Sequence, residues 1–291
     1  MELEQVLHSI SNEHSVGLGG CKRHGTTLQC CEYDVTVFDN KYAPSEIIQV
    51  GNDNVRIHHG SLEETNVNVL QQYEDMQIIS DNDWSLRVFL SNLKIKKAKI
   101  RSACIKNCLV DAAFCATKVR QDPHDPFAAA MTKCAAYFIA DALVLYNDKW
   151  RSPTHMLEFI RKSKKVKDNS FTVVAETLGL ERATPSLLER MAKSTIGFSD
   201  MTENNGHHKI INAKYQYLTS NALLSDCYFY LGYVNRNNLF SIKEMLHKRN
   251  DLVHILKTAL DFEHDTTKIE KQAGLLHNLA NEMSHDFRVY A

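Results

Sequence analysis

The sequence predicts an α+β protein in which a small mixed β-sheet is followed by an all-helical region. Three observations lead to this prediction. Six of the 11 glycines lie within the first 60 residues, so the N-terminal part turns often. Apolar and polar residues alternate in short runs up to about residue 95, and from there apolar residues recur with helical spacing. Only 5 prolines interrupt the chain, which favours long helices. We therefore expect a sheet domain at residues 1–95 and a helical domain at residues 96–291.

Composition and charge exclude several classes of protein. Lys and Arg number 34 against 35 for Asp and Glu, so the formal net charge is −1. Such a chain has no overall attraction for polyanions, and any such contact must come from a local patch. No run of about 18 apolar residues is present, and the acidic start lacks the basic residues of a secretory signal. The eight Cys then read as reduced thiols. We expect a cytoplasmic protein that binds neither membrane nor nucleic acid.

Elements of the sheet region follow from turn residues and from period-two alternation. Tyr33, Val35 and Val37 form one face of a strand, and Glu32, Asp34 and Thr36 form the other. The Gly51-Asn52-Asp53-Asn54 segment separates two β-rich runs, as in a hairpin. In order, we expect a helix at 3–10, strands at 15–20 and 28–38, a hairpin at 47–58, a helix at 62–75, a strand at 76–80, and a helix that Asp81 caps.

The residues after about 95 are predicted to form helices. The first long helix should end at Asp122-Pro123-His124-Asp125-Pro126, because prolines remove backbone donors and restrict the residues before them. Further helices are predicted at 127–147, 154–163, 169–179, 184–196, 207–235, 240–261 and 264–285.

Two carboxylates in the second strand are the most informative feature. Glu32 and Asp34 are separated by one residue, so they lie on the same face of a strand, roughly 6 to 7 Å apart along the chain. Two hard carboxylate oxygens on one face suit Mg²⁺ that also takes phosphate oxygens. We therefore predict Glu32 and Asp34 as metal ligands.

A glycine turn precedes these acids in the segment Val16-Gly17-Leu18-Gly19-Gly20. Backbone without side chains at Gly19 and Gly20 can approach a phosphate closely. Lys22 and Arg23 follow directly and would neutralise phosphate charge. Together these residues supply the parts that metal-assisted nucleotidyl transfer needs.

The pattern Leu18-Gly19-Gly20, a spacer, and then Glu32-Tyr33-Asp34 resembles the signature of the polymerase-beta-like nucleotidyltransferase superfamily. The resemblance implies transfer of a nucleoside monophosphate from Mg-NTP to an acceptor hydroxyl. A third acid is usual on the following strand of that superfamily, where this chain has Arg56. A cation there would oppose a second metal, but it could instead hold a phosphate or pair with Asp34.

A second resemblance, to kanamycin-type aminoglycoside nucleotidyltransferases, involves two segments. The runs are Val55-Arg56-Ile57-His58-His59-Gly60-Ser61-Leu62-Glu63-Glu64 and Asp141-Ala142-Leu143-Val144-Leu145-Tyr146-Asn147-Asp148-Lys149-Trp150-Arg151. The second run resembles a helix that carries the catalytic base in those enzymes. The matching position here is Leu145, which cannot take a proton. Asp141, one turn earlier on the same helix face, is the predicted replacement.

The predicted function is therefore metal-dependent nucleotidyl transfer, with ATP as the expected NTP and a small molecule as the favoured acceptor. Two alternatives stay open: a catalytically impaired nucleotide-binding or regulatory protein on the same fold, and a helical interaction module. A homodimer also stays open. A zinc site from Cys21, His24, Cys30 and Cys31 is disfavoured, because their spacing lacks paired C-x-x-C units.

Overall fold

The computed structural model describes residues 14–25, 27–163, 169–202, 206–242, 248–249 and 251–290. The predicted helix at residues 3–10 lies outside the described residues. The chain divides into two units. Unit 1 comprises Met1–Ala103 and Glu203–Tyr217, and unit 2 comprises Cys104–Thr202 and Leu218–Ala291. This division differs from the expected boundary at residue 95, because a later segment of the helical region joins unit 1.

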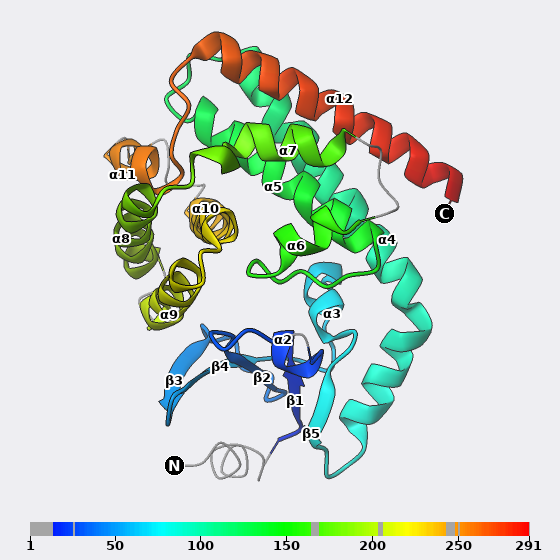
Figure 1. Ribbon diagram of the computed structural model, residues 1–291. Helices are drawn as coiled ribbons and strands as arrows, with labels where there is room; N and C mark the ends of the chain where they lie inside the picture. Colours follow the sequence, from blue (N-terminus) through cyan, green and yellow to red (C-terminus); the bar gives the residue numbers. More distant parts are fainter. Residues whose placement is uncertain are drawn as a thin grey trace. The chain divides into compact units, whose positions relative to one another are not determined.

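A five-stranded mixed sheet forms the centre of unit 1 (Figure 1). Its strands, in sequence order, are β1 (Val16–Gly19), β2 (Tyr33–Val37), β3 (Glu46–Val50), β4 (Asp53–His59) and β5 (Gln77–Ser80). Their order in the sheet is β3-β4-β2-β1-β5. Only β2 and β4 are parallel; the other neighbouring pairs are antiparallel. The predicted strand at 28–38 begins later than expected, at Tyr33.

Alternation along β2 explains how the sheet separates an apolar face from a polar one. Val35 and Val37 are buried in one cluster with valines of three other strands. The intervening residues therefore face the opposite side, where Asp34 is adjacent to Arg56 of β4 in the parallel register. The core of the sheet thus fixes which side chains meet on the polar face.

Turns and caps predicted from the sequence are present. Gly51 has φ of 60° between β3 and β4, which form the expected hairpin. Asp81 accepts backbone hydrogen bonds from Leu86 at 3.1 Å and Arg87 at 2.9 Å, so it caps the long helix that follows. Helices that contribute to unit 1 are α2 (Gly20–Arg23), α3 (Val67–Tyr73), the first part of α4 (Ser85–Gln121), and the start of α9 (His207–Ser220).

Unit 2 is helical throughout its described residues. The end of α4 at Gln121 agrees with the predicted stop before Asp122-Pro123. Its other helices are α5 (Ala128–Tyr146), α6 (Met156–Arg161), α7 (Ser170–Leu178), η1 (Leu180–Arg182), α8 (Pro185–Thr202), α10 (Leu224–Ser241), α11 (Leu252–Ala259) and α12 (Thr266–Tyr290). A small mixed sheet followed by helices confirms the predicted α+β class.

Two predicted helices were wrong in extent. The helix expected at 207–235 is divided into α9 and α10, because Ala222 adopts φ of 57°. At this break Leu223 N–H donates to the Leu218 carbonyl and Ala222 N–H to the Thr219 carbonyl, a helix-ending pattern usually formed at glycine. The helix expected at 240–261 is represented, in the described part, by α11 and the last residues of α10.

One described helix, α5, is long and apolar enough to cross a membrane by length and composition. Within the structure, 89% of its apolar window is buried. Burial to this extent is the property of a core helix, so α5 is weak support for a membrane span.

Candidate functional site

The glycine turn lies directly against Asp34. Gly19 is opposite Asp34 in the antiparallel pairing of β1 and β2. Gly20 follows with φ of 66°, in the left-handed region that favours glycine. A Cβ added at Gly20 would collide with Oδ2 of Asp34. Both the backbone conformation and the space at Gly20 therefore require glycine.

We expect Gly20→Ala to destabilise unit 1 more than Gly25→Ala does. Gly25 also has positive φ, of 68°, but a Cβ there meets no atom within 4 Å. Both variants carry the backbone cost, of about 1 kcal/mol, and only Gly20→Ala adds overpacking of about 1–3 kcal/mol. Urea unfolding of the two variants measures the difference. Equal losses would mean that Asp34 can move away from the turn.

Both predicted acids face the same cation. Nη2 of Arg56 lies 3.7 Å from Oε1 of Glu32, and its Nη1 lies 4.0 Å from Oδ1 of Asp34. Nε2 of His58 lies 3.5 Å from the same Asp34 oxygen. Glu32 and Asp34 therefore do share one side of the sheet, as predicted, but Arg56 lies within reach of both. Their role as metal ligands stays a prediction.

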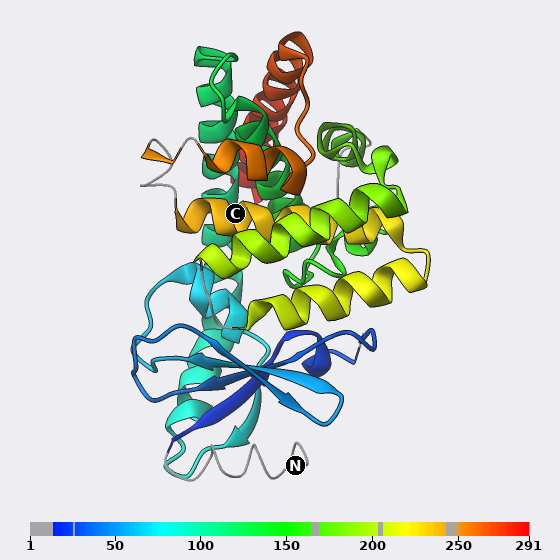
Figure 2. The same ribbon diagram turned by 90° about the vertical axis from the view of Figure 1, so that its left-hand side faces the viewer.

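Lys214 completes the neutralisation of Glu32. Its Nζ lies 2.9 Å from Oε1 and 2.7 Å from Oε2 of the carboxylate. Both residues are buried, with 4% exposure for Lys214 and 6% for Glu32. The lysine comes from α9, which lies alongside the sheet in both views (Figures 1 and 2). Both oxygens of Glu32, one of the two predicted metal ligands, are thus in contact with an ammonium group.

His207, at the start of α9, supports Arg56. Its Nε2 lies 2.8 Å from Nη2 of Arg56. Burial, together with the positive charges of Arg56 and Lys214, lowers the pKa of His207 to about 3. The imidazole is therefore neutral at physiological pH and accepts the hydrogen bond that the guanidinium donates.

Asp34 is ionised in this arrangement. Burial raises the pKa of its carboxyl, but the hydrogen bond from His58 and the charge of Arg56 outweigh burial and hold that pKa below its ordinary value. Two carboxylates thus face two permanent cations. A neutral set of this kind has no surplus negative charge to attract a divalent metal ion.

The two predicted phosphate-binding cations have different surroundings. Nζ of Lys22 lies 3.6 Å from Oδ1 of Asp53 and 4.6 Å from the centre of the Tyr33 ring. Arg23 is exposed to solvent. Both follow the glycine turn on α2, but nothing in the geometry tests their contact with phosphate, which stays a prediction.

Asp141 lies in unit 2 and is held by partners from that unit. Its carboxylate is 1% exposed. Oδ2 lies 2.5 Å from Nη1 of Arg236, and Oδ1 accepts a hydrogen bond from the Tyr233 hydroxyl at 2.8 Å. Both oxygens are therefore engaged within unit 2, by an ion pair and by a hydrogen bond, and the role of Asp141 as a base stays a prediction.

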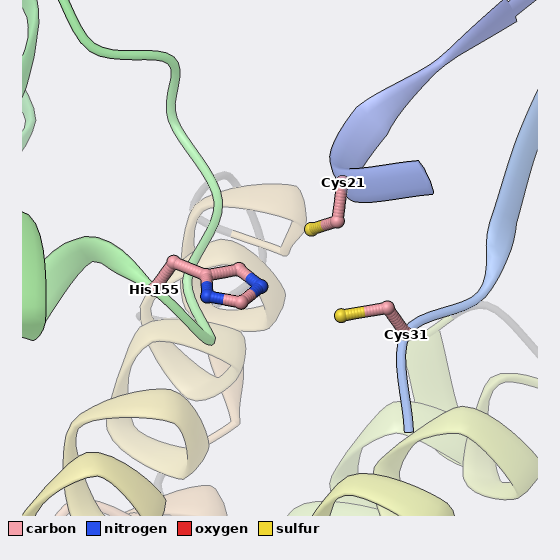
Figure 3. A group of neighbouring side chains, drawn as sticks. All are labelled: Cys21, Cys31 and His155. Atoms are coloured by element: carbon pink, nitrogen blue, oxygen red, sulfur yellow. The ribbon is translucent and has the colours of Figure 1, made fainter. Parts of the chain in front are cut away.

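The geometry of unit 1 provides only two neighbouring cysteines for the disfavoured zinc site. Figure 3 shows Cys21 and Cys31, whose sulfur atoms lie within 4.8 Å of one another; it also labels His155, a residue of unit 2. The described residues of unit 1 add no third ligand to this pair. A hydrogen bond with Cys21 lowers the pKa of Cys31, but one with Cys30 and burial raise it, to about 11 overall.

Two site residues were missed in the sequence. Lys214 is 182 residues from Glu32 and lies in a region that carried only a helical signal. Nor does the sequence indicate a role for His207: a histidine at the start of a helix ordinarily faces solvent or caps the helix, whereas His207 contacts Arg56. No local pattern could have indicated either contact.

No protein-family model matches the chain, and no curated protein matches it. Among solved structures, it is similar to a nucleotidyltransferase-like protein from Exiguobacterium sibiricum, with 13% sequence identity and a TM-score of 0.35. The match covers 88% of this chain and 91% of that chain. The name of that protein agrees with the superfamily resemblance, but a TM-score this low carries no argument. The interpretation of the site therefore rests on the geometry of unit 1.

Proposed function

We propose that unit 1 binds the triphosphate of a nucleotide beside the glycine turn and does not transfer the nucleotidyl group. One observation carries this proposal: the Lys214 ammonium contacts both oxygens of Glu32. The position of Arg56 between Glu32 and Asp34 supports it. The protein is then the catalytically impaired, nucleotide-binding alternative on the predicted fold.

Magnesium does not fit these residues as they are arranged. Mg²⁺ is usually held by one or two free carboxylates together with substrate phosphates. Here the carboxylate of Glu32 is committed to Lys214, and that of Asp34 is near both Arg56 and His58. A metal ion would have to displace the buried ammonium of Lys214 and the partly exposed guanidinium of Arg56, so we derive no step that involves it.

A neutral site that does not fit a divalent metal ion can still bind a phosphate chain. With the acids compensated, the polyanion meets no net repulsion from them. The exposed side chain of Arg23, the partly exposed side chain of Lys22 and the glycine backbone at Gly19 and Gly20 are available on the adjacent turn. ATP is the nucleotide that we test first, following the resemblance in the sequence.

Metal-dependent transfer to an acceptor hydroxyl is the second candidate. The shared side of Glu32 and Asp34, next to a turn that requires Gly20, favours it. It also requires Lys214 and Arg56 to move away from the acids. A small-molecule acceptor and a homodimer belong to this candidate as predictions.

We expect ATP to raise the melting temperature of the protein by the same amount in EDTA and in Mg²⁺, because ammonium and guanidinium groups replace the metal. Ligands stabilise the folded state that binds them, so thermal unfolding measures this directly. Lys22→Gln with Arg23→Gln should reduce the shift. Lys41→Gln is the matched control, since Lys41 is an exposed lysine of unit 1 that pairs with Asp39.

Incubation with α-labelled ATP distinguishes the two candidates. If the wild-type protein transferred label to an acceptor in Mg²⁺ and the Asp34→Asn variant did not, nucleotidyl transfer would replace our proposal. A melting temperature that ATP does not change, with or without Mg²⁺, would exclude both candidates.

A further inference from the structure

The first part of α4 carries an unusual accumulation of positive charge. Seven basic residues and no acidic residue lie between Ser85 and Val110, in a chain whose formal net charge is −1. Their spacing along a helix places them on more than one side. Some of these basic residues form ion pairs within unit 1, and others are exposed to solvent.

Two of the seven belong to the structure of unit 1. Nζ of Lys97 lies 3.0 Å from Asp75 and 3.3 Å from Glu74, and Nη2 of Arg101 lies 3.0 Å from Glu74. By contrast, Lys94, Lys96 and Lys99 are exposed and form no ion pair with any residue that the structure describes. Three lysines of α4 are therefore exposed without an ion pair among the described residues.

Large apolar side chains are exposed among these lysines. Ile95 is 83% exposed, Val88 59% and Trp84 62%. At about 100° per residue, Val88, Ile95 and Lys99 lie within about 40° of one another around the helix axis. The Arg87 guanidinium stacks 4.3 Å above the Trp84 ring. Exposed apolar side chains next to lysines on one helix are typical of segments that lie at a membrane surface.

We propose that one side of α4 binds the surface of an anionic lipid bilayer. Val88, Ile95 and Lys99 form the centre of this side, and Lys94 and Lys96 flank it about 100° to either side of Ile95. Trp84 lies just before the helix, and together these residues are called the basic–apolar face. Lysines attract acidic headgroups, and apolar and aromatic side chains beside them enter the boundary between headgroups and acyl chains. A nucleic acid would use the lysines on phosphate but would leave Ile95 and Val88 in water. The mixture of charge and exposed apolar area favours lipid.

This inference does not depend on the proposed nucleotide site. The expectation that the protein binds no membrane came from the net charge of the whole chain, and that argument allowed polyanion contacts through a local patch. The basic–apolar face is such a patch, and it lies on a helix that needs no rearrangement to present it.

Co-sedimentation of the full-length protein with vesicles tests the inference. We expect binding to vesicles of phosphatidylcholine and phosphatidylserine, weakening as salt rises, and none to phosphatidylcholine alone. Lys94→Glu with Lys99→Glu should weaken binding on the order of 25-fold or more, since one basic residue near an anionic surface contributes about fivefold. Ile95→Ser keeps the charge and should weaken binding by about tenfold through lost apolar burial.

A matched control has the same charge change elsewhere. Lys257→Glu with Lys271→Glu alters two exposed lysines of unit 2 and should leave vesicle binding within about twofold, because salt screens distant charges. An equal loss in this control, equal binding to both vesicle compositions, or binding to single-stranded RNA without binding to anionic vesicles would overturn the inference.

Discussion

Lys214→Met should lower the free energy of unfolding of unit 1 by about 3–5 kcal/mol, because it leaves a buried carboxylate without its ammonium partner. Glu32 and Lys214 are 6% and 4% exposed, so water cannot replace the lost contact. Methionine preserves most of the length and the aliphatic volume of lysine, which limits the effect to charge. Urea unfolding followed by the fluorescence of Trp84, in a Trp150→Phe background, reports on unit 1.

A double-mutant cycle separates the ion pair from packing. Glu32→Gln with Lys214→Met removes both charges, and replacement of a buried pair by neutral groups is often close to neutral in free energy. We therefore expect the double variant to be more stable than Lys214→Met alone. Lys41→Met, which removes an exposed lysine 3.2 Å from Asp39, should cost less than about 1 kcal/mol. A single variant as stable as wild type would show that Arg56 alone compensates Glu32.

The local parts of the candidate site could be predicted from the sequence. Alternation placed Glu32 and Asp34 on one side of a strand, and the coordinates bring both within 4.0 Å of Arg56. The glycine turn lies where expected because left-handed φ at Gly20 leaves few residue choices. The hairpin at Gly51 and the cap at Asp81 were predicted for similar local reasons.

The partners that change the chemistry could not be predicted. Lys214 reaches Glu32 from another part of the chain, and nothing in the spacing of α9 distinguishes it from a solvated helical lysine. The break between α9 and α10 was missed because Ala222 adopts the left-handed conformation that a sequence normally indicates with glycine. The first partner depends on a tertiary contact, and the second feature lacks the residue type that normally indicates it.

These errors bear on function more than on fold. Arg56 alone left two interpretations open, since a single cation could hold a phosphate or could pair with Asp34. With Lys214, two positive charges lie close to the two carboxylates. The functional interpretation therefore turns on a residue without a sequence signal, and Lys214→Met tests that residue directly.

Acidification should destabilise unit 1 through His207. Its pKa is about 3 in the folded protein, owing to burial and then to Arg56 and Lys214, whereas an unfolded histidine has a pKa of about 6.5. Between these two values the unfolded chain binds more protons than the folded chain, so stability falls as the pH is lowered from about 7 toward 3. At pH 4.5 the loss from this residue should be about 2 kcal/mol, allowing for partial exposure of the ring.

His207→Gln isolates this contribution from the carboxylates that titrate in the same range. Glutamine still offers an oxygen to Nη2 of Arg56 but takes up no proton. We expect the variant to lose about 2 kcal/mol less than wild type between pH 7 and pH 4.5, in urea unfolding of both proteins. His208→Gln, at the exposed neighbouring position on α9, should lose stability as wild type does. If His207→Gln showed the full wild-type loss, His207 would already be charged in the folded protein, and Arg56 would then have to turn away from it toward solvent or toward the two acids.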